Sequence, residues 1–377
     1  MQIMVRFIHT ADWHLGLKTI QLGEKGREAK AMRFETVARI IKLAKEKSVD
    51  FIIITGDTFD DHNVDNIVVR RAVEILNAAA PIAVYILPGN HDPFIAGGVW
   101  DRTEWEDRIG DHVILLKNEE KIAVNEIIEM YPCPLKQKKS PIDPTEWIPI
   151  RTSNDHHIRI GIAHGNLDIL SKKSDFPIAP DRCKNSGLNY LALGEWHSSK
   201  IMDRLAYPGS PEPTSFNDSD TGKILVVEIK DADSEPVIEP ITVGKLKWGI
   251  VSKTINDQSD LISLETFMKE LENPTIQVIR MNIKIESMDT EIFTRLSTLR
   301  KQLGEDIFYM DWSEDDLVMP PLSLPKIPEG ILSQVDDALS KILSSQIPDG
   351  PAHKFASENH EDIENARLLL HRLSREE

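Results

Sequence analysis

The sequence contains little cysteine and no long apolar run. Its 377 residues include two cysteines, Cys133 and Cys183, which lie far apart and belong to no CxxC pattern. This excludes a disulfide-stapled scaffold and a thiolate zinc finger, and it favours a reducing compartment. No apolar run approaches the roughly 20 residues that a membrane-spanning helix needs, and the first apolar stretch is too short for a signal peptide. We therefore expect a cytoplasmic protein without a membrane partner.

Positive charge is also scarce. Lysine and arginine number 44 against 61 acidic residues, which gives a formal net charge of -17. A protein that holds nucleic acid by charge alone needs a surplus of lysine and arginine, so this composition argues against non-specific nucleic-acid binding. A phosphate-handling enzyme can nevertheless be acidic if bound metal ions supply the positive charge locally.

The length predicts two or three domains, because a typical domain holds about 100–200 residues. In the first 245 residues, nearly continuous apolar runs have the composition of strands buried on both faces. Apolar residues at helical spacing, around 34–44 and 69–76, separate the early runs. This order predicts an α/β sandwich with a later strand at 224–229. The five principal runs lie at 4–12, 49–57, 82–92, 158–166 and 188–197.

The remainder of the chain predicts a smaller unit and a tail. Residues 246–318 alternate strand-like and helix-like segments in the order β-α-β-α-β, which is typical of a compact α/β module. Residues 319–377 begin with the proline-rich stretch 319–330, which we interpret as a linker. Two amphipathic helices are expected beyond it, around 331–343 and 363–373.

Each principal apolar run ends in side chains that can bind a metal ion. Open α/β sheets bind ligands at the carboxyl ends of their strands, so we expect these side chains to converge on one site. The candidates are Asp12 and His14, then Asp57, then Asn90 with His91 and Asp92, then His164, and finally Glu195 with His197.

The chemistry of this set predicts a centre with two cations. Carboxylate, amide and imidazole groups without a thiolate suit manganese, iron or magnesium better than a structural zinc ion. Two cations about 3.5–4 Å apart need a bridging oxygen, and the carboxylate of Asp57 is the natural bridge.

The order of these motifs resembles the calcineurin-like metallophosphoesterase superfamily. The residues that carry the resemblance are DWH, GD, GNHD, HG and a final GEWH. The longer segments HTADWHLG, TGDTFD, PGNHD, LALGEWH and YPGSPEPTSF resemble, within it, the nuclease subunits of SbcC–SbcD-type DNA exonucleases. The resemblance covers about residues 5–230. It implies two β-sheets flanked by helices, a capping domain that presents DNA, and C-terminal helices that dock a partner.

The resemblance also implies a role for each motif residue. His91 would protonate the leaving oxygen of the scissile phosphate, and Asp92 would orient His91. The first metal would be held by Asp12, His14, Asp57 and His197, and the second by Asp57, Asn90 and His164.

Glu195 is the one departure from the family pattern, which has a histidine ligand of the second metal at this position. A carboxylate can replace an imidazole, so we expect Glu195 to be an oxygen ligand of the second metal. The alternative is a side chain turned outward to pair with a lysine or arginine.

We therefore expect a metal-dependent DNA nuclease, an exonuclease or endonuclease of DNA repair or recombination. Its cofactors would be two divalent ions, Mn²⁺ first and Mg²⁺ or Fe²⁺ next. Expected partners are DNA and an SbcC-type coiled-coil ATPase, and a homodimer is compatible with the sequence. Two alternatives stay open. One is a phosphoesterase for small phosphodiesters, nucleotides or phosphoproteins, and the other is a binding protein with a decayed site.

Overall fold

The computed structural model describes residues 4–169, 175–287, 289–312, 327, 330–344 and 360–374. It divides into two compact units, Met1–Trp248 and Gly249–Glu377. The expected boundary at 318 and most of the predicted linker lie outside the described residues, so the three-part division stays a prediction. In the described part, no helix has the length and apolar character needed to cross a membrane.

Two six-stranded sheets form the centre of the first unit, as predicted. The strands of the first sheet run in the order β14 (Val237–Thr242), β13 (Lys223–Ile229), β1 (Val5–Thr10), β2 (Phe51–Thr55), β3 (Ala83–Leu87) and β4 (Val113–Leu115). Those of the second run in the order β11 (Lys200–Met202), β12 (Leu205–Tyr207), β10 (Tyr190–Gly194), β7 (Ile158–His164), β6 (Ile128–Cys133) and β5 (Ile122–Ala123). A small two-stranded ladder pairs β8 (Asn166–Leu167) with β9 (Pro177–Ile178).

Alternate residues of the central strands enter two different cores. In β2, Phe51 and Ile53 pack between the two sheets, whereas Ile52 and Ile54 pack under the helices of the outer face. All five residues of this strand are buried, which explains why the apolar run is continuous rather than alternating. The expected strand at 224–229 is β13, which pairs antiparallel with β1.

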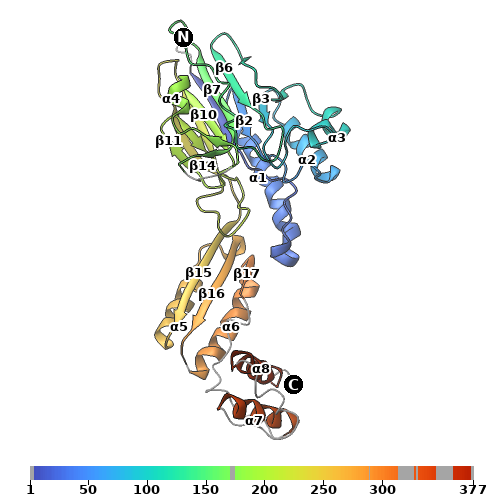
Figure 1. Ribbon diagram of the computed structural model, residues 1–377, viewed down its shortest axis with the longest axis vertical. Coiled ribbons are helices and arrows are strands. Elements are labelled where there is room, and N and C mark those ends of the chain that lie inside the picture. The colour runs from blue at the N-terminus through green and yellow to red at the C-terminus, as the bar shows by residue number, and fades with distance from the viewer. Residues whose placement is uncertain are drawn as a thin grey trace. The chain divides into compact units, whose positions relative to one another are not determined.

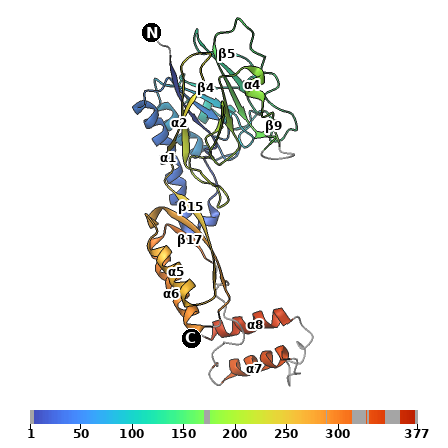
Figure 2. The same cartoon turned by 90° about the vertical axis from the view of Figure 1, so that its left-hand side faces the viewer.

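Helices cover both outer faces of this sandwich (Figure 1). The helices are α1 (Gly26–Glu46), α2 (Asn66–Asn77), α3 (Thr103–Glu106) and α4 (Arg182–Ser186). In Figures 1 and 2, α1 and α2 lie on one side of the paired sheets and α4 on the other. The Asp65 carboxylate caps α2 by accepting a hydrogen bond from the backbone N–H of Ile67 at 2.8 Å. The apolar face of α1, including Val37 and Ile40, packs on the first sheet.

Parallel pairing brings the carboxyl ends of the central strands to common edges. β1 pairs parallel with β2, and β2 pairs parallel with β3. In the second sheet, β7 pairs parallel with both β6 and β10. This arrangement is what allows residues that follow β1, β2, β3 and β10 to approach one another.

The second unit has the predicted β-α-β-α-β order. A three-stranded sheet of β15 (Lys247–Ile255), β16 (Gln277–Ile285) and β17 (Tyr309–Asp311) shares one apolar core with α5 (Gln258–Lys269) and α6 (Thr290–Asp306). Farther along the chain, α7 (Ile331–Leu343) and α8 (His360–Leu373) lie side by side (Figure 2). Asp336 of α7 joins them, because it accepts from Arg367 at 2.6 Å and lies 2.7 Å from Nε2 of His371.

Candidate metal centre

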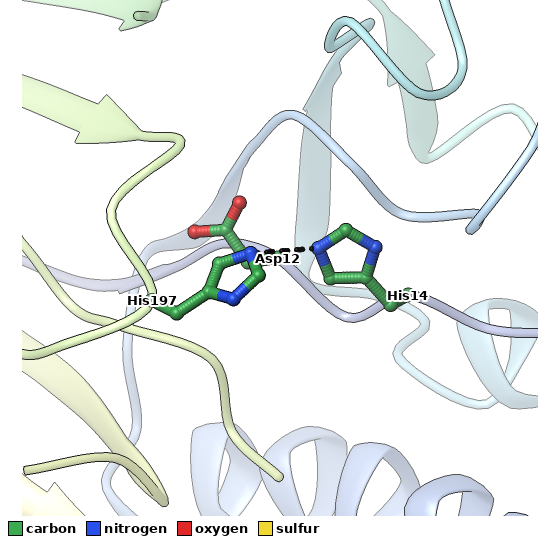
Figure 3. A group of neighbouring side chains, drawn as sticks. All are labelled: Asp12, His14 and His197. Carbon is green, nitrogen blue, oxygen red and sulfur yellow. Dashed lines mark hydrogen bonds between the residues drawn. The ribbon is translucent and has the colours of Figure 1, made fainter. Parts of the chain in front are cut away.

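The side chains that follow the central strands gather in two adjoining groups. In one group, ligand atoms of Asp12, His14 and His197 lie within 4.8 Å of one another (Figure 3). In the other, the same holds for Asp12, Asp57 and His164. Asp12 belongs to both groups, so the two potential cation positions are adjacent.

Asn90 and Glu195 complete the second group. Nε2 of His164 lies 3.0 Å from Oδ1 of Asn90 and 3.1 Å from Oε2 of Glu195. Asp57 stands between the groups, because its Oδ2 is 3.4 Å from Nε2 of His164 and 3.8 Å from Nε2 of His14. All seven residues predicted as metal ligands are therefore together in the structure.

Several of these residues have an unusual backbone conformation. A left-handed φ costs free energy in any residue with a Cβ atom, and such positions cluster at functional sites. The residues concerned are Asp12 with φ 53°, His14 with φ 43°, Asp57 with φ 51° and Glu195 with φ 101°.

Two glycines leave the space that His164 occupies. A Cβ atom at Gly56 or at Gly194 would overlap the His164 ring, and at Gly194 it would also overlap the carbonyl of Thr55. Gly56 also has φ 88°. Neither position can take a larger residue without moving the imidazole.

Two of the three histidine ligand candidates, His164 and His197, are oriented through the other ring nitrogen. Nδ1 of His164 donates to the carbonyl of Thr55 at 2.8 Å, which leaves Nε2 as the nitrogen that faces the site. Nδ1 of His197 lies 2.9 Å from the hydroxyl of Thr214, and that hydroxyl donates to Asp218 at 2.7 Å. We therefore assign the proton of His197 to Nδ1.

The donor set fits a bound cation. Oδ2 of Asp12 is fully buried and has no hydrogen-bond partner among the described residues. Nε2 of His14 and Nε2 of His197 face each other at 3.1 Å (Figure 3). With the His197 proton on Nδ1, its Nε2 presents a lone pair to the same space as Nε2 of His14, so one cation there would be bound by both imidazoles. Divalent ions would thus be held by groups already aimed inward.

In the second group, the opposite charges of Asp57 and His164 shift the pKa values of both residues. Burial by itself would raise the pKa of Asp57, but His164 and His14 hold it well below its usual value. Burial would lower the pKa of His164, yet Asp57 and Glu195 raise it well above the ordinary value. A divalent cation must displace that imidazole proton in order to bind Nε2.

His91 borders the site, but Asp92 does not have the predicted orienting role. Nδ1 of His91 donates to the carbonyl of Asp60 at 2.7 Å. The two carboxylate oxygens of Asp92 accept instead from the backbone N–H groups of Phe59 and Gly89, at 2.9 and 2.8 Å. Asp92 is fully buried beneath the loop and stabilises its backbone, so the expectation that it orients His91 is wrong.

Asp60 is a site residue that sequence reasoning missed. It contacts two histidines, because its Oδ1 is 3.3 Å from Nδ1 of His14 and its carbonyl accepts from His91. Thr214 and Asp218, which orient His197, were missed as well. Asp60 lies in the segment TGDTFD and Thr214 in YPGSPEPTSF, but none of the three residues stands at the end of a principal apolar run, so no role was assigned to them.

A separate acidic group at the other end of β6 and β7 has a different character. Glu129, Asp155 and His157 are close enough to hold a metal ion. Lys121 lies 2.6 Å from Glu129, however, and Arg159 lies 3.5 Å from Asp155. These two cations already balance the two carboxylates, so the group is an ion-pair network.

Comparison with known proteins adds a family match and several relatives. A family model described as calcineurin-like phosphoesterase matches residues 5–209. An uncharacterized metallophosphoesterase, YhaO of Bacillus subtilis, is 26% identical over 243 residues, covering 60% of this chain and 58% of that protein. The DNA double-strand break repair protein Mre11 of Thermoplasma acidophilum is 26% identical over 238 residues, covering 56% and 57%. An SbcCD nuclease subunit of Bacillus subtilis is 31% identical over 91 residues, covering 23% and 22%. The matches thus span at most 58% of these relatives.

Proposed function

The chain belongs to the calcineurin-like phosphoesterase family, a family of metal-dependent hydrolases, and on this premise we propose that it is a two-metal DNA nuclease. The observation that carries the proposal is the convergence of Asp, Asn, Glu and His side chains at one edge of the sandwich. His164 and His197 there have their Nδ1 atoms engaged by protein acceptors, so that both Nε2 atoms are available as ligands.

We assign the first cation to Asp12, His14, Asp57 and His197, and the second to Asp57, Asn90, His164 and Glu195. When bound, two divalent cations would neutralise the charge of a phosphodiester and polarise its phosphorus–oxygen bonds. Mn²⁺ is the expected ion, with Mg²⁺ or Fe²⁺ as substitutes, because oxygen and imidazole ligands without thiolate favour such ions.

His91 is the proposed proton donor to the leaving oxygen. Its side chain is exposed at the border of the centre, where substrate can reach it. The hydrogen bond from Nδ1 to the carbonyl of Asp60 fixes the ring, and it leaves Nε2 as the nitrogen that delivers the proton.

DNA is the proposed substrate because two relatives are described as a DNA repair protein and a nuclease subunit. The second unit, with its own core and sheet, would present the DNA. The net charge of -17 favours a second candidate, hydrolysis of small phosphodiesters, nucleotides or phosphoproteins.

Parallel assays with two substrates distinguish these candidates. We expect Mn²⁺-dependent cleavage of linear and hairpin DNA, with DNA affinity that falls steeply as salt increases. The control variant His164→Ala should abolish cleavage of every substrate, because it removes a ligand. Hydrolysis of bis(p-nitrophenyl) phosphate without cleavage of DNA would replace the nuclease assignment with the small-substrate one.

We also propose that α7 and α8 dock an SbcC-type coiled-coil ATPase in a cytoplasmic complex. The support is the similarity to the SbcCD nuclease protein and the exposure of Ile331 and Leu369 on these helices, at 80% and 54%. Deletion of residues 331–377 should leave cleavage of a short DNA intact and should abolish binding of the ATPase. A deletion variant that is folded but inactive would contradict this assignment.

A further inference from the structure

Arg33 of α1 is a buried cation that donates only to backbone carbonyls in its described contacts. Its side chain belongs to a residue that is 6% exposed. Nη1 lies 3.1 Å from the carbonyl oxygen of Trp13 and 3.2 Å from that of Glu212, and Nη2 donates to the carbonyl of Pro213 at 2.7 Å. A buried guanidinium is tolerated only when its donors are satisfied, and the flat fork of arginine can satisfy several acceptors at once.

The three carbonyls belong to two segments that carry or orient first-metal ligands. Trp13 lies between Asp12 and His14 in the chain. Pro213 directly precedes Thr214, whose hydroxyl accepts from His197. Arg33 therefore joins the segment that contains two ligands to the segment that orients the third.

Ser210 makes a second, smaller connection between the same segments. Its hydroxyl oxygen lies 2.7 Å from the carbonyl oxygen of Asp12 and 2.6 Å from that of Glu212. The Glu212 carboxylate in turn accepts from the Thr36 hydroxyl of α1 at 2.5 Å and from the backbone N–H of Lys245 at 2.6 Å. The connection is thus anchored to the helix on one side and to the chain beyond β14 on the other.

Electrostatics alone would give Arg33 the opposite effect on the metal centre. A guanidinium repels divalent cations, so its presence next to a metal site lowers metal affinity unless its geometric role outweighs the repulsion. The charge and geometry explanations consequently predict changes of opposite sign when Arg33 is neutralised.

We propose that Arg33 is a positioning residue of the metal centre, which sets the separation of the Asp12–His14 segment from the segment that orients His197. This inference rests on the proposed metal centre and is independent of which phosphodiester is the substrate. It concerns the first metal, because the segments that Arg33 joins carry Asp12 and His14 and orient His197, which we assign to that metal.

Titration of the metal-free protein with Mn²⁺, followed by calorimetry and by the electron paramagnetic resonance of free Mn²⁺, tests this proposal. In Arg33→Met we expect affinity at one of two sites to fall about 10–100-fold, the usual effect of losing a residue that supports a ligand. Arg33→Lys should lose most of the same affinity, because one ammonium cannot serve three carbonyls in two segments.

Arg159→Met is the matched control for loss of a buried arginine. Arg159 is 1% exposed and donates to the carbonyls of Ser186 and Pro149, both at 2.6 Å, away from the metal centre. Its replacement should lower thermal stability and leave both Mn²⁺ affinities unchanged. Equal loss of Mn²⁺ affinity in the two arginine variants would mean that destabilisation alone is responsible and would overturn the proposal.

Ser210→Ala keeps the test decisive if Arg33→Met does not fold. It removes one hydroxyl from the same connection, and we expect a smaller loss of affinity at the same single site. Unchanged or tighter Mn²⁺ binding in the folded Arg33 variants, or in Ser210→Ala if those do not fold, would overturn the positioning role. A parent protein that binds no Mn²⁺ would overturn the metal centre itself and this inference with it.

Discussion

The carboxylate of Glu195 lies 3.1 Å from Nε2 of His164. Its other oxygen accepts from the side-chain amide of Asn166 at 3.2 Å. Among the described residues, Glu195 has no ion pair with a lysine or arginine, so the outward orientation is not observed. The glutamate thus lies beside His164, a predicted ligand of the second metal.

Removal of the Glu195 carboxylate should abolish binding of the second metal. In Glu195→Ala we expect metal titration to give one retained Mn²⁺ and one that is lost, because the second group keeps only Asp57, Asn90 and His164. The control is Glu235→Ala, since Glu235 is an exposed partner of Arg204 on the surface. Unchanged two-site binding in Glu195→Ala would show that Glu195 is not a ligand.

Glu195 should also determine which ion the second site prefers. Two divalent cations carry +4, and Asp12, Asp57 and Glu195 carry -3, so the centre keeps about one positive charge where a histidine would leave two. Hard, oxygen-preferring ions should gain over zinc. We expect Glu195→His to retain two metals and to shift competition from Mn²⁺ toward Zn²⁺. The same Mn²⁺ to Zn²⁺ affinity ratio in both proteins would contradict this reasoning.

His91 should affect catalysis and not metal binding. Its Nδ1 is engaged by the carbonyl of Asp60, and although His91, His14 and Asp60 lie close enough to hold an ion, His91 is not a member of the two groups that contain Asp12. In His91→Asn we expect both metals to remain bound and phosphodiester cleavage to fall about 10²–10⁴-fold, the usual contribution of a general acid. His156→Asn, in an exposed loop, is the control that should change neither quantity. A metal lost from the His91 variant would make this residue a ligand.

His9 should make the folded protein sensitive to mild acid. It is fully buried between the two sheets, with Nδ1 2.8 Å from the Tyr190 hydroxyl and Nε2 3.0 Å from the Thr55 hydroxyl. Burial lowers its pKa from 6.5 to about 3. Below pH 6.5, His9 therefore binds a proton in the unfolded chain but not in the folded chain. The free energy of unfolding consequently falls by about 1.4 kcal/mol per pH unit until about pH 3.

Urea unfolding with a metal chelator at pH 7, 6 and 5 measures this contribution. His9→Gln should be less stable than the parent at pH 7, because buried hydrogen bonds are lost, yet its stability should decline less steeply with acid. His156→Gln should keep the slope of the parent, since that histidine is exposed. If the parent and His9→Gln lose stability at the same rate, His9 is not buried as a neutral group.

The long strands of the sandwich could be predicted from the sequence, because a strand that is buried on both faces has a continuous run of apolar residues. The apolar runs at 49–57 and 158–166 are continuous, and both became strands with every residue buried. Shorter strands were less visible. β6 contains Glu129 and Pro132, and its composition gave no comparable signal, although all six residues are buried.

The ligand candidates could be predicted for a similar reason. Parallel strands bring their carboxyl ends to one edge, so polar residues directly after apolar runs are expected to meet, as Asp12, Asp57 and Glu195 do. What the sequence could not supply was the partner of each side chain. Asp92 follows His91 directly, but the turn of the backbone aims its carboxylate at two N–H groups instead.

The sequence by itself thus determined that the long apolar runs are buried, which of these strands carry the site and which side chains at their ends offer ligand atoms, because periodicity and residue chemistry are local properties. Only the tertiary structure decided how those ligands are held. Thr214 reaches His197 across 17 residues of chain, and Arg33 reaches Pro213 across 180. Such contacts depend on where distant segments lie after folding. No local sequence pattern specifies which carbonyl oxygen will lie within hydrogen-bond distance of a helix residue such as Arg33.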